Sequence, residues 1–257
     1  MSTFVFIHGA GDVGWYWHLV EAELRERGHD VVAPDLPCDD DDAALPEYAD
    51  AVAEAIGDRT DLVVVAQSLG GFTAPLVCER VPVELLVLVA PMIPAPKEAP
   101  ADYWANTRYE EEAHERYEDD IALFYQDVPP ELASKALRRS RRQSEARLGE
   151  PSPLAAWPAI PTRVLLCRDD RLFPAPWREG KQHLDGLFRD TFAHLAGTGF
   201  WRVRQHAASG AEAETARQRF AQWRAETLEA IQTLADSGSL TPLGASFLDN
   251  MRGSAAR

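Results

Sequence analysis

The sequence predicts an α/β protein built on a mostly parallel sheet with helices on both faces. Short apolar runs alternate along the chain with amphipathic helical patterns, which is typical of such sheets because parallel strands are joined through helical crossovers. Two of the runs end in turns of small residues, at His8-Gly9-Ala10-Gly11 and at Gln67-Ser68-Leu69-Gly70. A helical, proline-bounded stretch over 91–160 interrupts this alternation and predicts an insertion.

The strands are predicted in five apolar runs, each bounded by turn or helix signals: 4–7, 31–33, 62–66, 85–90 and 163–167. Between the first two runs, Trp17, Val20 and Leu24 fall on one face of an amphipathic helix that ends near Gly28. The loop over 34–42 ends in four consecutive aspartates. Their spacing lacks the alternating ligands and the turn glycine of a calcium loop, so we predict a solvated acidic turn.

The glycine-rich loop after the first strand has two interpretations. A Gly-x-Gly-x-x-Gly pattern over 9–14 suggests dinucleotide binding, but Asp12 would face a pyrophosphate and the aromatic run 15–17 would crowd the start of the helix. Alternatively, the glycines turn backbone amides inward. The amide of Ala10, together with that of Leu69, would then stabilise an oxyanion, which is worth roughly 3 kcal/mol per donor. We favour the second interpretation over the first.

Ser68 stands at a turn between a buried strand and a helix. Ala66 and Gly70 flank it at two residues on either side, and small residues there suit a strained turn that lifts the hydroxyl above the edge of the sheet. The following helix directs its positive N-terminal dipole to the same place. Taken alone, this segment would favour an ordinary βα turn with a capping serine.

The two loops together resemble those of α/β-hydrolases, in particular small bacterial esterases and methylesterase-like enzymes, over about residues 3–178. The resemblance implies the α/β-hydrolase fold, with Ser68 as nucleophile and a catalytic carboxylate after a later strand. In the family pattern that carboxylate stands four residues before a proline, here Pro174, which selects Asp170 over Asp169. Either aspartate would also suit a plain turn position.

The same resemblance implies that 91–160 forms a helical cap over a core made of residues 1–90 and 161–257. Trp15, Met92 and Trp104 are then candidates for lining an apolar substrate pocket, although each would equally serve to pack the cap onto the sheet.

A cluster of arginines lies within this stretch. Arg138, Arg139, Arg141 and Arg142 either meet an anionic group of a substrate or carrier, or form a solvated helix face that balances the glutamates at 110–112.

A serine hydroxyl needs a base, and the resemblance implies a histidine in the last third of the chain. His206 follows an alternating run over 200–205 and precedes a turn and a helix, as expected of a loop after a closing strand. The residues around His194 look helical instead. We therefore predict His206 as the base, with His194 as the alternative.

The C-terminal tail departs from the family pattern from about residue 178. From about residue 192 it is more similar to the C-terminal part of bacterial HExxH-motif peptide-modification proteins, although no HExxH occurs here. A gene fusion or a shifted reading frame would produce such a tail over 192–257. It would also leave the hydrolase core without its base and closing strand.

Composition limits the partners. A formal net charge of −15 disfavours nucleic acids and anionic membrane surfaces, because binding to phosphates is driven by Lys and Arg. No apolar run is long enough to cross a bilayer and no basic leader precedes the first strand, so a cytoplasmic location is expected. The three scattered cysteines indicate neither a disulfide framework nor a zinc site. The oligomeric state stays open.

Two functional hypotheses follow. The first is a serine hydrolase, free of metal and cofactor, that cleaves a small and largely apolar ester, lactone or thioester through an acyl-enzyme. The second is a catalytically impaired relative that binds a small hydrophobic ligand under the cap. A lyase on the same scaffold is a further alternative, because a fold does not determine its chemistry.

Overall fold

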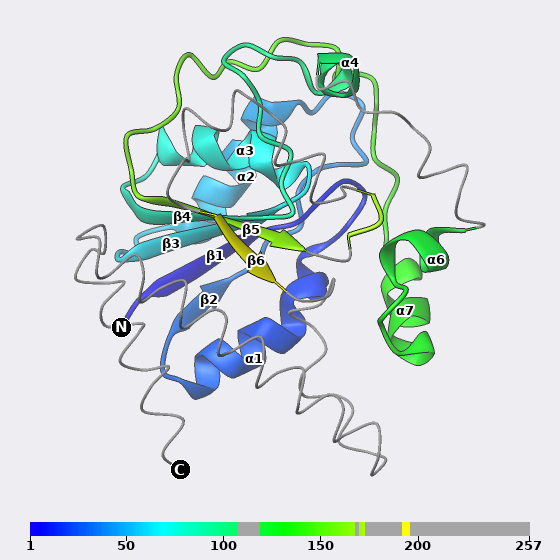
Figure 1. Cartoon of the computed structure of the whole chain (residues 1–257). Coiled ribbons are helices and arrows are strands. Elements are labelled where there is room, and N and C mark those ends of the chain that lie inside the picture. The colour runs from blue at the N-terminus through cyan, green and yellow to red at the C-terminus, as the bar shows by residue number, and fades with distance from the viewer. Residues whose placement is uncertain (107–118, 168–169, 173–191, 196–257) are drawn as a thin grey trace.

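The structure, a computed structural model, describes residues 1–106, 119–167, 170–172 and 192–195 (Figure 1). Within these residues, six strands form one sheet in the order β2-β1-β3-β4-β5-β6, and every neighbouring pair is parallel. Their bounds are Thr3–Ile7 (β1), Asp30–Val32 (β2), Leu62–Gln67 (β3), Val83–Val89 (β4), Thr162–Cys167 (β5) and Phe192–Leu195 (β6). The five strands predicted from the sequence are thereby confirmed, with ends that shift by one or two residues.

Helices lie on both faces of the sheet (Figure 1). On one face the 3-10 helix η1 (Gly14–Trp17) leads into α1 (His18–Glu26), and on the other lie α2 (Leu45–Ile56) and α3 (Gly70–Cys78). Helix α1 has its predicted position and ends just before Gly28, whose φ of 83° is one that glycine adopts readily. The predicted mostly parallel sheet with helices on both faces is confirmed.

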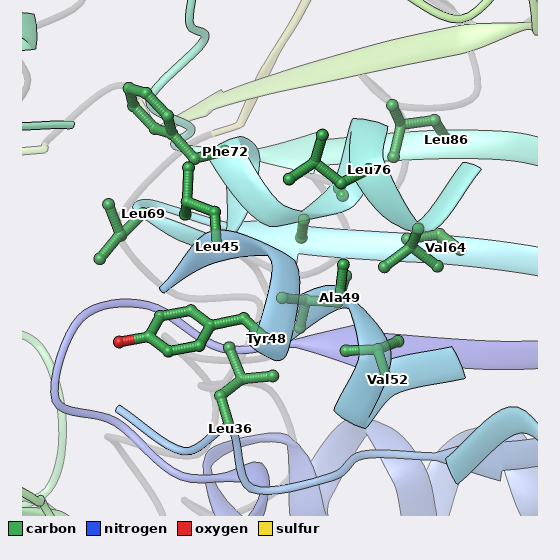
Figure 2. Close-up of a cluster of buried hydrophobic side chains, with 14 of the residues drawn as sticks. Leu36, Leu45, Tyr48, Ala49, Val52, Val64, Leu69, Phe72, Leu76 and Leu86 are labelled. Carbon is green, nitrogen blue, oxygen red and sulfur yellow. The ribbon is translucent and has the colours of Figure 1, made fainter. Parts of the chain in front are cut away.

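Alternation along the strands divides the core between the two faces. In β1, Val5 and Ile7 belong to the cluster under α2 and α3, whereas Phe6 packs with Trp17 under α1. Strand β3 divides in the same way, which is why central strands carry apolar residues at almost every position. The larger cluster is shown in Figure 2, where side chains of α2 and α3 meet those of the sheet. It includes Leu45, Tyr48, Ala49 and Val52 of α2, Leu69 before α3, Phe72 and Leu76 of α3, and Val64 and Leu86 of the sheet.

The insertion between β4 and β5 contains four short helices among its described residues: η2 (Pro100–Asp102), α4 (Tyr103–Asn106), α6 (Asp120–Phe124) and α7 (Pro130–Leu137). Helices α6 and α7 lie together at one side of the molecule, apart from α4 (Figure 1). The division into a core and a cap stays a prediction.

Two arginines of the cluster bind the acidic loop over 39–42 and so connect the insertion to it. Arg141 lies 3.4 Å from Asp39, and Arg142 lies 2.7 Å from Asp41. Arg142 also donates to the carbonyl of Asp39. The glutamates at 110–112, which were expected to balance these arginines, lie outside the described residues. The acidic turn over 39–42 is therefore paired with cations rather than simply solvated.

Strand β6 corrects one prediction. The residues around His194 looked helical from the sequence, but Phe192–Leu195 pairs in parallel with β5, and His194 is aligned with Leu166. The strand predicted over 200–205 lies outside the described residues.

Other sequence predictions concern small sites and membrane segments. Cys38, Cys78 and Cys167 are free thiols. In the described part of the chain no three His, Cys, Asp or Glu side chains gather in a way that would hold a metal ion. The described helices include none with the length and apolar character to span a bilayer.

Candidate active site

The order of the strands indicates where a site would form. Strand β1 lies between β2 and β3. The segment that follows β1 therefore crosses one face of the sheet, and the segment that follows β3 crosses the other. In open α/β sheets, ligands bind in the crevice that such a reversal opens at the carboxyl ends of the strands. The glycine-rich loop follows β1, and Ser68 follows β3, so both segments border this position.

Ser68 forms a strained turn between β3 and α3. Its φ of 51° is in the left-handed region, which is rare for residues other than glycine, asparagine and aspartate. The turn is held by its backbone: the Ser68 amide donates to Val89 at 3.2 Å, and the Ser68 carbonyl accepts from Met92 at 2.9 Å. The side chain is partly exposed. These contacts fix a strained strand-to-helix turn at the residue that the sequence singled out.

Close packing around the elbow explains its two glycines. A Cβ on Gly70 would lie 2.9 Å from the carbonyl oxygen of His8, and a Cβ on Gly71 would lie 2.0 Å from that of Met92. Helix α3 can therefore start close to β1 and to the segment after β4 only because neither residue has a side chain.

The loop after β1 lies directly against the elbow. A Cβ on Gly9 would lie 3.1 Å from Ser68 Cβ and 2.5 Å from Gln67 Oε1. Buried His8 holds the loop from below, since its Nδ1 lies 2.8 Å from the Gly9 carbonyl and its Nε2 accepts from the Leu36 amide at 2.9 Å. Burial lowers the pKa of His8, so it is neutral, with both ring nitrogens engaged. His8 is a structural residue and not a base for Ser68.

The far end of this loop is tied to the insertion. The Gly11 carbonyl accepts from the Arg141 amide at 2.7 Å, and the Gly11 amide donates to Gln143 Oε1 at 3.3 Å. The φ of Gly11 is 67°, and a Cβ there would lie 2.8 Å from the Arg141 carbonyl oxygen. The backbone between Gly9 and Gly11 is thus held at both ends.

The amides of Ala10 and Leu69 are the predicted oxyanion donors. Within the described residues, no protein acceptor takes a hydrogen bond from either amide. Leu69 lies at the N-terminus of α3, where the first amides of a helix point outward and carry its positive dipole. Both amides therefore lack a protein acceptor in the described part of the chain, and their role as oxyanion donors stays a prediction.

Asp170 follows β5, at the same carboxyl edge of the sheet as Ser68. Its Oδ1 accepts from the Leu172 amide at 3.0 Å, and its own amide lies 3.4 Å from the Cys167 carbonyl. This is the tight turn that an acid after a strand requires, and it would also suit a purely structural aspartate. The catalytic role of Asp170 stays a prediction.

Both candidate bases come from the C-terminal part of the chain. His194 contributes to β6, whose backbone alone is described, and His206 lies outside the described residues.

The three predicted pocket residues fall in two hydrophobic clusters. Met92 is buried in the larger core, and Trp104 packs against the same core. Trp15 belongs to a separate cluster, stacks on His18 and lies under Arg139, whose Cζ is 4.3 Å from the ring centroid. Met92 touches the elbow through its backbone. All three remain predictions as pocket residues.

Sequence reasoning missed a polar network beside the elbow. The Asp12 carboxyl is hydrogen-bonded to Tyr16 and to the Gly9 amide. The Tyr16 hydroxyl lies 2.5 Å from that of Tyr125 and 3.0 Å from that of Ser140. Burial raises the pKa of Asp12 to about 7, with the two hydrogen bonds acting in the opposite direction. The available signal was the four-residue spacing of Asp12 and Tyr16, but Tyr125 comes from a remote segment that no local pattern connects to them.

Comparison with known proteins gives a consistent family. A family model described as "Alpha/beta hydrolase family" matches residues 4–238. "Probable esterase PIR7A" of Oryza sativa subsp. indica is 41% identical over 106 residues, which cover 36% of this chain and 40% of that protein. "Methylesterase 7" of Arabidopsis thaliana is 32% identical over 113 residues, covering 39% and 44%. The chain therefore spans less than half the length of these curated relatives.

Solved structures extend the similarity of fold. Polyneuridine aldehyde esterase superposes with a TM-score of 0.63 at 17% identity, covering 86% of this chain and 99% of its own. An extracellular α/β-hydrolase from a Paenibacillus species gives a TM-score of 0.59 at 19% identity, covering 87% and 99%.

Proposed function

The chain belongs to the alpha/beta hydrolase family, and from this premise we propose that it is a carboxylic-ester hydrolase that uses Ser68 as its nucleophile. The observation that carries the proposal is the strained backbone of Ser68, held at the carboxyl edge of the sheet and in contact with the Gly9 loop. A φ in the left-handed region at a serine costs free energy, and such strain persists where the surrounding structure fixes it for a function.

Each step of the proposed mechanism has a candidate group. The Ser68 hydroxyl attacks the ester carbon while a histidine takes its proton, and the carbonyl oxygen becomes an oxyanion that accepts from the Ala10 and Leu69 amides. Collapse of this intermediate expels the alcohol, which receives the proton back from the histidine. Water then repeats the sequence on the acyl-enzyme and releases the acid. Asp170 orients the histidine, for which His206 is the preferred candidate.

The proposed substrates are small esters with an apolar body, with lactones and thioesters as chemically related alternatives. Two observations support esters among these. Curated relatives bear the names esterase and methylesterase, and one is called methyl jasmonate esterase 1, from Vitis vinifera. Leu69 and Met92, which adjoin the Ser68 turn and belong to the buried apolar core, would favour an apolar acyl or alcohol group.

An active-site probe tests the proposal directly. We expect a fluorophosphonate to label the wild-type protein and to leave Ser68→Ala unlabelled, because only an activated serine reacts with it. Ser134→Ala on α7 is the matched control and should label like the wild type. Turnover of p-nitrophenyl butyrate should fall in Ser68→Ala by roughly a thousandfold or more.

Two results would overturn the proposal. Folded wild-type protein that neither labels nor turns over esters would favour the alternative, a hydrophobic-ligand-binding relative without catalysis. Labelling that persists in Ser68→Ala would move the nucleophile to another residue.

A further inference from the structure

We propose that Asp12 determines substrate specificity in this site, by accepting a hydrogen bond from a hydroxyl group on the acyl part of the ester. The inference rests on the proposed function and narrows its substrates to hydroxy esters.

Asp12 lies close to Ser68, on the other side of Gly9. The point where a Cβ on Gly9 would stand lies 3.1 Å from Ser68 Cβ and 3.2 Å from Asp12 Oδ2. The nucleophile and the carboxyl therefore flank one glycine, close enough for both to contact a single small substrate. Asp12 as a whole is partly exposed, whereas its carboxyl group is largely withdrawn from solvent.

The polar network described above holds this carboxyl in place. An ionised Asp12 carboxylate can only accept, so the single hydroxyl hydrogen of Tyr16 is donated to Asp12, and the Tyr16 oxygen then accepts from Tyr125. Tyr16 is on η1, whereas Tyr125 follows α6 in the insertion. Two segments far apart in the sequence are thus combined to orient one carboxyl group.

The chemistry of ester hydrolysis explains why a carboxylate at this position would favour a substrate hydroxyl. A carboxylate near Ser68 opposes the negative charge that develops on the oxyanion, and a desolvated carboxylate gains strongly from any additional donor. The Gly9 amide and the Tyr16 hydroxyl supply two donors, while two carboxylate oxygens accept about four. A substrate hydroxyl would donate to an acceptor position of the carboxylate that is still unused, and it would offset the negative charge of Asp12. A plain alkyl chain would do neither.

Matched ester pairs test this inference. We compare kcat/KM for p-nitrophenyl 3-hydroxybutyrate and p-nitrophenyl butyrate, and for methyl mandelate and methyl phenylacetate, at pH 8. In Asp12→Ala the hydroxy-to-deoxy ratio should fall by about tenfold or more relative to the wild type in at least one pair. The different intrinsic reactivity of the esters cancels, because each pair is compared between proteins.

Two further variants sharpen the comparison. Asp12→Asn keeps the size of the side chain and one acceptor oxygen without the charge, so it should lower the ratio by a smaller factor and also serves if Asp12→Ala does not fold. Asp58→Ala, on an exposed turn, is the matched control and should leave both the ratio and the rates at wild-type values.

The possible outcomes are separable. A ratio within twofold of the wild type in both variants for both pairs overturns the inference and leaves the proposed function standing. An equal loss for hydroxy and deoxy esters also overturns it, because Asp12 would then only shape the Gly9 loop. Wild-type protein that hydrolyses none of the four esters removes the proposed function, and the inference with it.

Discussion

Gly9 borders Ser68 and leaves no room for a side chain. A methyl group on it would meet Gln67 Oε1, Ser68 Cβ and Asp12 Oδ2 within 3.2 Å. We predict that Gly9→Ala displaces the loop that carries the Ala10 amide and lowers kcat by about 100-fold, the loss typical of one oxyanion donor. KM should change much less, because the lost contact belongs to the transition state.

Gly149→Ala provides the control for this measurement. Its added methyl group meets no atom within 4 Å, so steady-state kinetics on p-nitrophenyl butyrate should match the wild type. Full activity of Gly9→Ala would show that the loop does not contribute to catalysis.

The carboxyl of Asp12 makes stability depend on pH. Its pKa is about 7 in the folded protein against 3.8 ordinarily, so between these values the folded state holds a proton that the unfolded chain has released. The stability due to this group therefore falls as pH rises from 4 to 7. Asn cannot ionise, so the Tm of Asp12→Asn should rise relative to wild type by about 5 °C between pH 4 and pH 8.

Other titrating groups near Asp12 do not obscure this effect. Burial raises the pKa values of Tyr16, Tyr125 and Cys38, so all three are neutral in this range. His8 acts with the opposite sign, since its lowered pKa costs stability as pH falls below 6.5, but it is present in both proteins. A constant Tm difference from pH 4 to pH 8 would contradict the assignment.

Single residues differed in how far the sequence could identify them. The turn at Ser68 was identifiable because its flanking small residues and the strand before it are local, and its strained backbone is observed. Asp12 was noticed only as an obstacle to pyrophosphate binding. Its environment depends on Tyr125 and on the closeness of Gly9 to Ser68, which arise from tertiary packing.

Secondary-structure elements show the same contrast. Strands β1, β3 and β4 were predicted because consecutive apolar residues have to fill both faces of a central strand. Strand β6 was missed because Phe192–Leu195 is only four residues long, and its pairing with β5 rather than its own pattern makes it a strand. The pairing of the arginines with the acidic loop was also missed, since the two segments lie about a hundred positions apart.

Where the insertion meets the acidic loop, one buried hydroxyl should outweigh an exposed ion pair. Ser144 is 3% exposed, donates to Asp41 at 2.6 Å and accepts from the Ala146 amide. Ser144→Ala should lower the free energy of unfolding by about 1–2 kcal/mol. The Arg142–Asp41 pair is mostly exposed and screened by solvent, so Arg142→Ala should lower the free energy of unfolding by less than Ser144→Ala does. Urea unfolding of both variants decides the order, and a larger loss in Arg142→Ala would reverse this interpretation.

Across the whole chain, the insertion reaches the site through the segment around Arg141 and Gln143. This segment binds Gly11 at one end of the proposed oxyanion loop and the acidic loop beyond it. Because Tyr125 also contacts Tyr16, the described part of the insertion touches the candidate site at two separate places. Displacing the insertion would therefore alter both the Gly11 end of the loop and the orientation of Asp12.

The proposed mechanism also requires a base from the C-terminal region, so residues from remote parts of the chain have to meet. Ser68 and Asp170 lie after β3 and β5 at one edge of the sheet, and a catalytic histidine would have to reach the same edge. We predict that His206→Ala lowers p-nitrophenyl butyrate turnover by roughly a thousandfold or more, whereas His194→Ala stays within a few-fold of wild type.

His29→Ala is the control, since His29 pairs with the Ser2 amide just before β1, at the opposite end of the strands. A large loss in His194→Ala alone would transfer the role of base to that residue. Undiminished turnover in both variants would mean that the C-terminal tail does not complete the site.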